Sequence, residues 1–142
     1  MRPADHITVD KSKREMLLLR DGRAIRRYAI GLGQSPAGPK EREGDGKTPE
    51  GRYTISGRNP ASAYRLSLRI SYPSAADIER ARNAGVDPGG DIMIHGTPNG
   101  EPESARRNRV ADWTKGCIAV TNEEMEEIWR LVPDGTPIQI NP

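Results

Sequence analysis

The sequence contains no phenylalanine, and its 142 residues include one cysteine and two histidines. A single cysteine excludes an internal disulfide, and Cys117, His95 and His6 together fall short of the ligand set of a zinc site. No apolar run approaches the roughly 18 residues that a membrane-spanning helix needs. We therefore expect no metal, no other cofactor and no membrane span.

An excess of charge of one sign is also absent. The 22 lysines and arginines nearly balance the 20 acidic residues, which gives a formal net charge of +2. This balance argues against a nucleic-acid-binding surface. The hydrophobic fraction of 34% indicates a thin core, but the chain is still too apolar and too well punctuated by turn signals to be disordered. The length suits a single domain over residues 1–142.

Apolar–polar alternation dominates the chain and predicts a mainly β fold. Residues 14–20 and 23–31 flank Asp21-Gly22, the signal of a two-residue type I′ hairpin. Further short strands are predicted at residues 6–9, 52–56, 66–72, 91–95, 117–120 and 137–140. Residues 31–47 are rich in glycine, proline and charge, and are predicted as a loop. We expect a twisted β-sandwich or an open barrel.

Two short helices are predicted from their capping residues. Ser74 with Asp77 has the spacing of a capping box, and Gly85 is placed to end the helix that follows. Thr121 with Glu124 has the same spacing and opens a second helix.

The residues best suited to catalysis are His95 and Cys117. Each lies at one end of a predicted strand and beside a glycine, Gly96 or Gly116. An imidazole next to a thiol can accept its proton and stabilise a thiolate that reacts well below pH 8.5. Main-chain N–H groups around Gly116 could bind a developing oxyanion. A lone cysteine is, however, more often a small buried apolar residue, so the residues alone leave both interpretations open.

Two sequence runs together resemble the signature of the L,D-transpeptidase catalytic domain family, also called YkuD or ErfK/YbiS. They are IHGT at residues 94–97 and TKGCI at residues 114–118. The runs GDGKTPEGRY at 44–53 and SYP at 71–73 lie where the family has similar segments, and the resemblance spans roughly residues 7–140. The run DWTKGCIAVTN at 112–122 is most similar to the YafK-like branch.

The resemblance implies an enzyme of the cell envelope that acts on peptidoglycan stem peptides. Its cysteine would attack the carbonyl of a meso-diaminopimelate residue in a tetrapeptide and release D-alanine. An amine on a second stem, or on an envelope lipoprotein, would then resolve the thioester. The residues after Met1 lack the apolar stretch of a signal peptide, which by itself leaves a cytoplasmic protein open. We expect a monomeric, trimmed mature domain of the periplasm.

The resemblance also implies roles for individual residues. Cys117 would be the nucleophile and His95 its base, with the carbonyl of Gly96 orienting the imidazole. The expected oxyanion donors are the main-chain N–H groups of Lys115, Gly116 and Cys117. Thr114 would hold the loop or the histidine.

Two departures from the family pattern bear on specificity. Many members have histidine where Lys115 stands, and arginine or asparagine where Ala119 stands. The segment between His95 and Thr114 is also longer than usual. Two alternatives to a transferase therefore stay open. One is a hydrolase with the same Cys–His pair that acts on a peptidoglycan or peptidoglycan–lipoprotein bond. The other is a catalytically inactive wall-binding module.

Five residues outside the motif are candidate substrate contacts: Tyr72, Trp113, Arg106, Arg107 and Arg109. The arginines could grip stem-peptide carboxylates or form a solvated charge run. Tyr72 could stack on substrate or pack in the core, and Trp113 could face substrate or anchor the loop. Asp45 and Thr48 fit the family's loop pattern, although turn chemistry alone also explains them.

Overall fold

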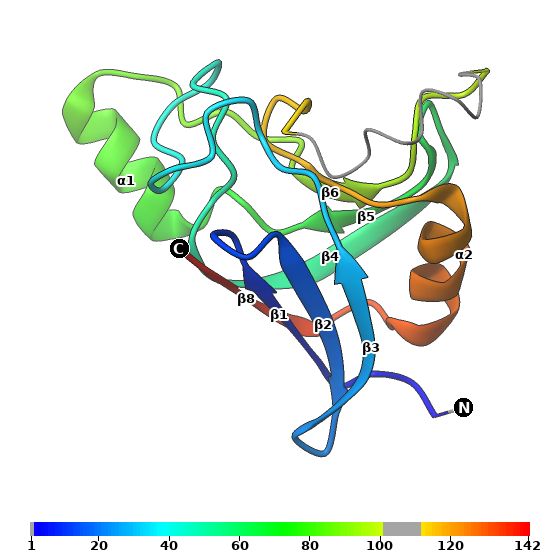
Figure 1. The fold of residues 1–142 in the computed structure, drawn as a ribbon. Helices are drawn as coiled ribbons and strands as arrows, with labels where there is room; N and C mark the ends of the chain where they lie inside the picture. Colours follow the sequence, from blue (N-terminus) through cyan, green and yellow to red (C-terminus); the bar gives the residue numbers. More distant parts are fainter. Residues whose placement is uncertain (1, 101–111) are drawn as a thin grey trace.

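The computed structural model describes residues 2–100 and 112–142 and contains eight strands and two helices (Figure 1). The strands are β1 His6–Asp10, β2 Glu15–Arg20, β3 Arg23–Ala29, β4 Gly51–Ser62, β5 Arg65–Ile70, β6 Met93–His95, β7 Ile118–Ala119 and β8 Pro137–Asn141. The helices are α1 Ala75–Ala84 and α2 Asn122–Leu131. Both helices are too short to cross a bilayer, and the described residues contain no other helix that could do so.

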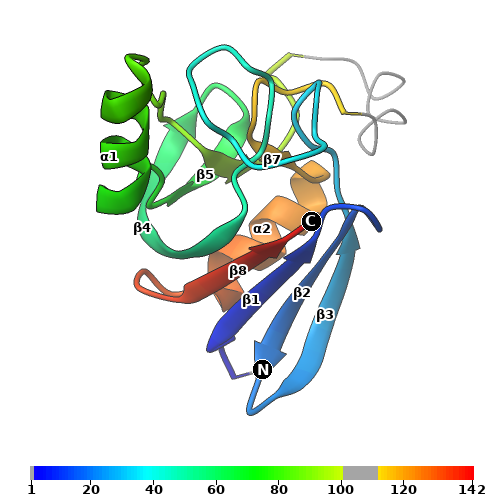
Figure 2. The same ribbon diagram turned by 90° about the vertical axis from the view of Figure 1, so that its left-hand side faces the viewer.

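All eight strands join one sheet in the order β3-β2-β1-β8-β4-β5-β6-β7. The pairs β1–β8 and β6–β7 are parallel, and the other neighbours are antiparallel. β4 pairs with β8 through its first residues and with β5 through the rest, and its register shifts between Ile55 and Gly57 and between Asn59 and Ser62. Such irregularities bend a strand, so the sheet curls into an open half-barrel (Figure 2). The predicted mainly β fold with two short helices is confirmed.

Local turn chemistry fixes the ends of several elements. Asp21 and Gly22 have φ of 51° and 78°, the left-handed conformations that a type I′ hairpin requires between β2 and β3. Ser74 and Thr121 each form the predicted capping box, with Asp77 and Glu124. Gly85 ends α1 in the left-handed conformation, also as predicted.

The hydrophobic core lies inside the curl of the sheet and is one continuous cluster. α2 closes part of it by burying Met125, Ile128 and Leu131, and it packs mainly on β5. α1 lies on the other side of the molecule in Figure 1 and buries Ala81 and Asp77. Ile94 and Ile118 connect the short strands β6 and β7 to this core.

Most strand boundaries differ from the sequence prediction by one or two residues, and β4 differs by more. β4 continues to Ser62 instead of ending at Ser56, because residues without apolar alternation still pair with β5 across the irregular register. The strand predicted at residues 91–95 begins only at Met93. Asp91 instead has φ of 54°, which turns the chain before β6.

Candidate active site

The parallel pairing of β6 and β7 brings the two motif segments together. Ile94 pairs with Ile118 and His95 with Ala119. Cys117 immediately precedes β7, and its Sγ accepts a hydrogen bond from Met93 N–H at 3.4 Å. Because alternate residues of paired strands share a face, His95 and Cys117 are diagonal neighbours on one face of the sheet. The pairing thus brings the segments that carry the predicted nucleophile and base side by side.

The imidazole of His95 is buried and held by its own chain. Its Nδ1 lies 2.7 Å from the carbonyl oxygen of Gly96. A carbonyl can only accept, so Nδ1 carries the proton and Nε2 is left as the basic nitrogen. Gly96 has no space for a side chain, because a Cβ there would lie 2.3 Å from Asn122 Oδ1. The Gly96 carbonyl therefore has the contact with His95 that the family resemblance implies.

Burial keeps both members of the pair neutral in the resting structure. It lowers the pKa of His95, and the hydrogen bond to Gly96 offsets this only in part. It also raises the pKa of the Cys117 thiol. The thiol donates to the carbonyl of Asp91 at 3.3 Å, and within the described chain its sulfur makes no hydrogen bond to His95. The expectation of a resting thiolate that reacts well below pH 8.5 is therefore corrected.

The nucleophile loop, residues 114–117, is fastened by Thr114. The buried Thr114 hydroxyl donates to the carbonyl of Cys117 at 2.7 Å and accepts from Gly116 N–H at 3.1 Å. The Gly116 N–H, expected as an oxyanion donor, is thus directed to Thr114 and not to a substrate. The N–H groups of Lys115 and Cys117 remain as candidates, and the Lys115 side chain is exposed.

Gly116 itself is dictated by close packing. Its φ is 142°, and a Cβ at this position would lie 2.7 Å from the carbonyl oxygen of Lys47 and 3.0 Å from Ile92 Cδ1. A side chain at residue 116 would therefore push the loop that carries Cys117 away from its neighbours.

Two aromatic side chains enclose the imidazole. The Tyr64 ring stacks on His95 with centroids 4.4 Å apart and an interplanar angle of 29°. Trp113 meets the imidazole edge-on at 5.6 Å. Sequence reasoning missed Tyr64, because it lies in the tight turn between β4 and β5, far along the chain from the motif. The scarcity of aromatic residues, 4% of the sequence, was the one signal that could have drawn attention to it.

The remaining candidates are Tyr72 and three arginines. Tyr72 is buried, its hydroxyl donates to the carbonyl of Pro88 at 2.7 Å, and its ring packs edge-on against Tyr53. This placement favours the core-packing interpretation over substrate stacking. Arg106, Arg107 and Arg109 lie outside the described residues. Among the residues that are described, no group of three His, Cys, Asp or Glu side chains could hold a metal ion.

Comparison with known proteins decides the family. The model of the L,D-transpeptidase catalytic domain, YkuD, matches residues 4–140, which is nearly the whole chain. The chain belongs to this family. The resemblance inferred from the motifs around His95 and Cys117 is therefore confirmed, and so is the expected fold.

Individual relatives agree with this assignment. YafK of Escherichia coli (strain K12), an L,D-transpeptidase by provisional assignment, is 35% identical over 122 residues, which cover 83% of this chain and 39% of YafK. This YkuD-family chain thus spans well under half of that relative. The helical cell shape determining protein Pgp2 of Campylobacter jejuni superimposes with a TM-score of 0.70 and 25% identity, covering 96% of this chain and 48% of Pgp2. An L,D-transpeptidase of Xylanimonas cellulosilytica shares the fold at a TM-score of 0.62, with 18% identity and coverage of 99% of this chain and 61% of that one.

Proposed function

We propose that the chain is a cysteine-dependent peptidoglycan acyl transferase, an L,D-transpeptidase, with Cys117 as nucleophile. One observation carries the proposal: the Gly96 carbonyl fixes the proton of His95 on Nδ1 and leaves Nε2 as the basic nitrogen, on a strand that pairs with the strand directly after Cys117. A nucleophile beside an oriented base is the arrangement of covalent acyl transfer. Membership of the YkuD family and the similarity to YafK support it.

In the proposed first half-reaction, the sulfur of Cys117 attacks the carbonyl carbon between meso-diaminopimelate and D-alanine of a tetrapeptide stem. The thiol proton passes to Nε2 of His95. The carbonyl oxygen becomes an oxyanion, which the N–H groups of Lys115 and Cys117 would stabilise. The carbon–nitrogen bond then breaks, and the D-alanine amine leaves with the proton held by His95, so that a thioester remains on Cys117.

In the second half-reaction, an amine of another stem attacks the thioester. It loses a proton to Nε2, and the sulfur leaves and recovers that proton as the thiol. Water in place of the amine would give a hydrolase with the same residues. The neutral resting pair implies that the proton moves only when substrate has bound, after the thiol turns from the Asp91 carbonyl toward His95.

The wider setting follows from the same proposal. A peptidoglycan substrate places the protein in the cell envelope or periplasm, as a monomeric single domain over residues 1–142. Trp113, against the imidazole, is the proposed wall of the substrate site. Arg106, Arg107 and Arg109 are proposed to contact stem-peptide carboxylates, and an envelope lipoprotein is proposed as a second acceptor.

A product assay tests the proposal. The purified chain is incubated with defined tetrapeptide muropeptides and the products are separated by mass, with Cys117→Ala as the control. Cross-linked dimers, absent with Cys117→Ala, support transfer. If tripeptides or freed lipoprotein stems form instead, the chain is a hydrolase and not a transferase. If neither product forms and a carbapenem leaves no adduct on Cys117, the chain is an inactive wall-binding module and the proposal fails.

A further inference from the structure

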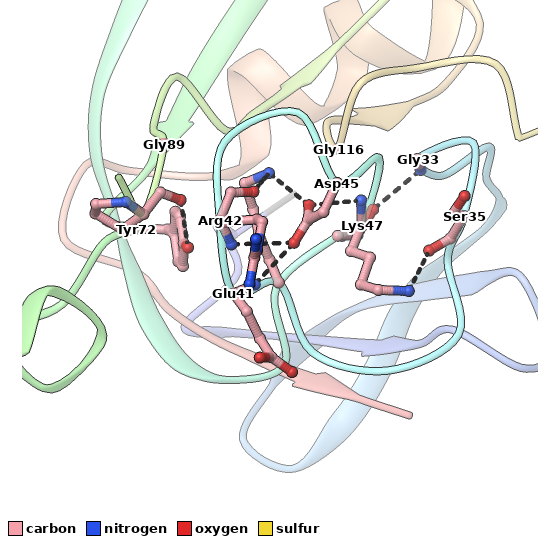
Figure 3. A network of polar contacts seen from close by, with 12 residues as sticks. Gly33, Ser35, Glu41, Arg42, Asp45, Lys47, Tyr72, Gly89 and Gly116 are labelled. Carbon is pink, nitrogen blue, oxygen red and sulfur yellow. Dashed lines mark hydrogen bonds and ion pairs between the residues drawn. The ribbon is translucent and has the colours of Figure 1, made fainter. Parts of the chain in front are cut away.

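The loop of residues 40–47, called the wedge loop below, lies between the two segments that lead to the candidate site (Figure 3). On one side the carbonyl of Lys47 faces the Cα of Gly116, next to Cys117. On the other side Glu43 N–H donates to the carbonyl of Asp87 at 2.8 Å, and a Cβ on Gly89 would lie 3.1 Å from the Cα of Glu43. Residues 87–90 lead into β6 and His95, so this wedge loop contacts the supports of both the nucleophile and its base.

An ion pair between a buried lysine and a half-buried aspartate gives the wedge loop its shape. Lys40 is 4% exposed, and its Nζ lies 2.9 Å from Asp45 Oδ1. The carboxylate also accepts from the main-chain N–H groups of Glu41, Arg42 and Lys47, at 2.9, 3.1 and 3.1 Å. One carboxylate thus gathers both arms of the loop around itself (Figure 3). Burial alone would raise the pKa of Asp45, but these hydrogen bonds outweigh it and hold the pKa at about 2.

Close main-chain contacts connect the wedge loop to the nucleophile loop. A Cβ on Gly33 would lie 2.2 Å from the carbonyl oxygen of Gly46 and 3.1 Å from the Cα of Gly116. Gly33 N–H donates to Thr48 Oγ1 at 3.1 Å, and Gly33 forms a bridge with Thr114. Protein interiors packed this closely transmit a displacement of one segment to the next.

Stability alone is a weak explanation for such a pair. A buried ion pair costs desolvation that its attraction barely recovers, and well-packed apolar residues often serve stability as well. A carboxylate with this many directed hydrogen bonds does, however, fix one geometry of the loop. That geometry places the Lys47 carbonyl, which lies against Gly116.

We propose that Lys40 and Asp45 are positioning residues of the active site: they hold the Lys47 carbonyl against Gly116 and thereby fix the main-chain N–H donors of the nucleophile loop. The inference deepens the proposed acyl transfer and rests on it. It assigns these residues no contact with substrate. Their loss should therefore impair steps that need the oxyanion donors and spare steps that need only the thiol.

Two reagents separate these steps on the same sulfur. A carbapenem acylates Cys117 through an oxyanion, whereas iodoacetamide alkylates the thiolate by displacement without one. The ratio of the two second-order rate constants reports oxyanion stabilisation when both are measured well below the melting temperature of each variant, because iodoacetamide also alkylates the thiol of an unfolded chain. The variants are Asp45→Asn and Lys40→Met, with Asp134→Asn as the matched control, because Asp134 pairs with Arg58 on the exposed surface.

We expect the ratio to fall at least about tenfold in Asp45→Asn and in Lys40→Met, and to stay within about twofold of the wild type in Asp134→Asn. With muropeptide substrates kcat should fall while KM changes little. A lower melting temperature with an unchanged ratio would show a merely structural role and overturn the inference. Should Asp45→Asn fail to fold, Asp45→Glu keeps the charge but moves the carboxylate by one methylene, and an unchanged ratio there has the same meaning. A wild-type chain that the carbapenem does not acylate would contradict the proposed function itself, and the inference with it.

Discussion

The two ends of the eight-stranded sheet are built differently. At one end β3, β2 and β1 have seven, six and five residues and a tight hairpin, whereas at the other end β6 and β7 have three and two. The regular end is specified by local alternation and needs little else. At the short end fewer main-chain groups take part in sheet pairing, and His95 and Cys117 lie there. The candidate site therefore lies where the strands are shortest and sheet pairing holds the chain least.

The chain segment that leaves the regular end also hydrogen-bonds to the short end and holds it in place. The loop after β3 crosses to the site, where Gly31 and Ala119 exchange main-chain hydrogen bonds at 2.9 Å in both directions. Gln34 N–H then donates to the carbonyl of Thr114 at 3.0 Å. In Figure 2 this loop follows β3 and passes beside β7. Substitutions of the same kind should therefore differ in effect between the two ends.

The largest contrast is expected between the two histidines. His95→Ala removes the proposed base, and acylation of Cys117 by a carbapenem should slow by about 10³-fold. His6→Ala, at the start of β1, should leave the rate within about twofold. Stopped-flow or mass-resolved acylation measures both. Equal rates for wild type and His95→Ala would remove the histidine from the mechanism.

Next in size is the contrast between two glycines with positive φ. Gly116→Ala places a methyl group against the Lys47 carbonyl, and acylation should fall by roughly 10²-fold. Gly22→Ala, with nothing within 4 Å, should cost about 1 kcal/mol of stability from backbone strain alone and leave acylation unchanged. Thermal unfolding and acylation kinetics are measured together. An active Gly116→Ala variant would show that the contact with the wedge loop is dispensable.

A smaller effect is expected for the aromatic ring on the imidazole. Tyr64→Leu loses the stacking on His95, and acylation should fall about fivefold, in keeping with roughly 1 kcal/mol for an aromatic pair. In the regular half, Tyr28→Phe removes the hydrogen bond to Glu127 and should cost about 1 kcal/mol of stability without slowing acylation. A Tyr64→Leu variant as fast as the wild type would reduce Tyr64 to a packing role.

The effect of pH is the smallest and concerns the resting site. Burial raises the pKa of Cys117, so the rate of alkylation by iodoacetamide should still be rising above about pH 8.5. Burial lowers the pKa of His95, so the imidazole stays neutral, and acylation by a carbapenem stays near its maximum, down to about pH 6.5. Rate–pH profiles measure both. An alkylation profile that levels off well below pH 8.5 would show a preformed ion pair and contradict the neutral resting state.

The features that could be predicted from sequence are those in which neighbouring residues decide the outcome. The Asp21-Gly22 hairpin and the capping boxes at Ser74 and Thr121 depend on residues within a few positions of one another. The motifs around His95 and Cys117 identified the family, and their glycines, Gly96 and Gly116, lie where a Cβ would meet neighbouring atoms; the catalytic roles of the pair stay a prediction.

The features that escaped prediction depend on contacts between distant segments. Tyr64 reaches His95 only because β4 continues past its expected end and turns back at the site. The Gly116 N–H is directed to Thr114 by a loop conformation that the motif does not encode by itself. The neutrality of Cys117 likewise arises from burial by segments distant in the sequence, and the residues next to Cys117 do not reveal that burial. Of the ion pair in the wedge loop, the sequence pointed to Asp45, as a turn residue, but not to its link with Lys40.

One further consequence follows from the place of β8. This strand lies between β1 and β4, and its pairing on both sides makes the sheet continuous from the first three strands to the strands of the candidate site. While the polypeptide is being synthesised, this continuous strand pairing must wait for residues 137–141. Such late closure of contacts far apart in sequence slows folding. A chain interrupted before Pro137 would keep every residue of the site and still lack the strand that unites it with its support.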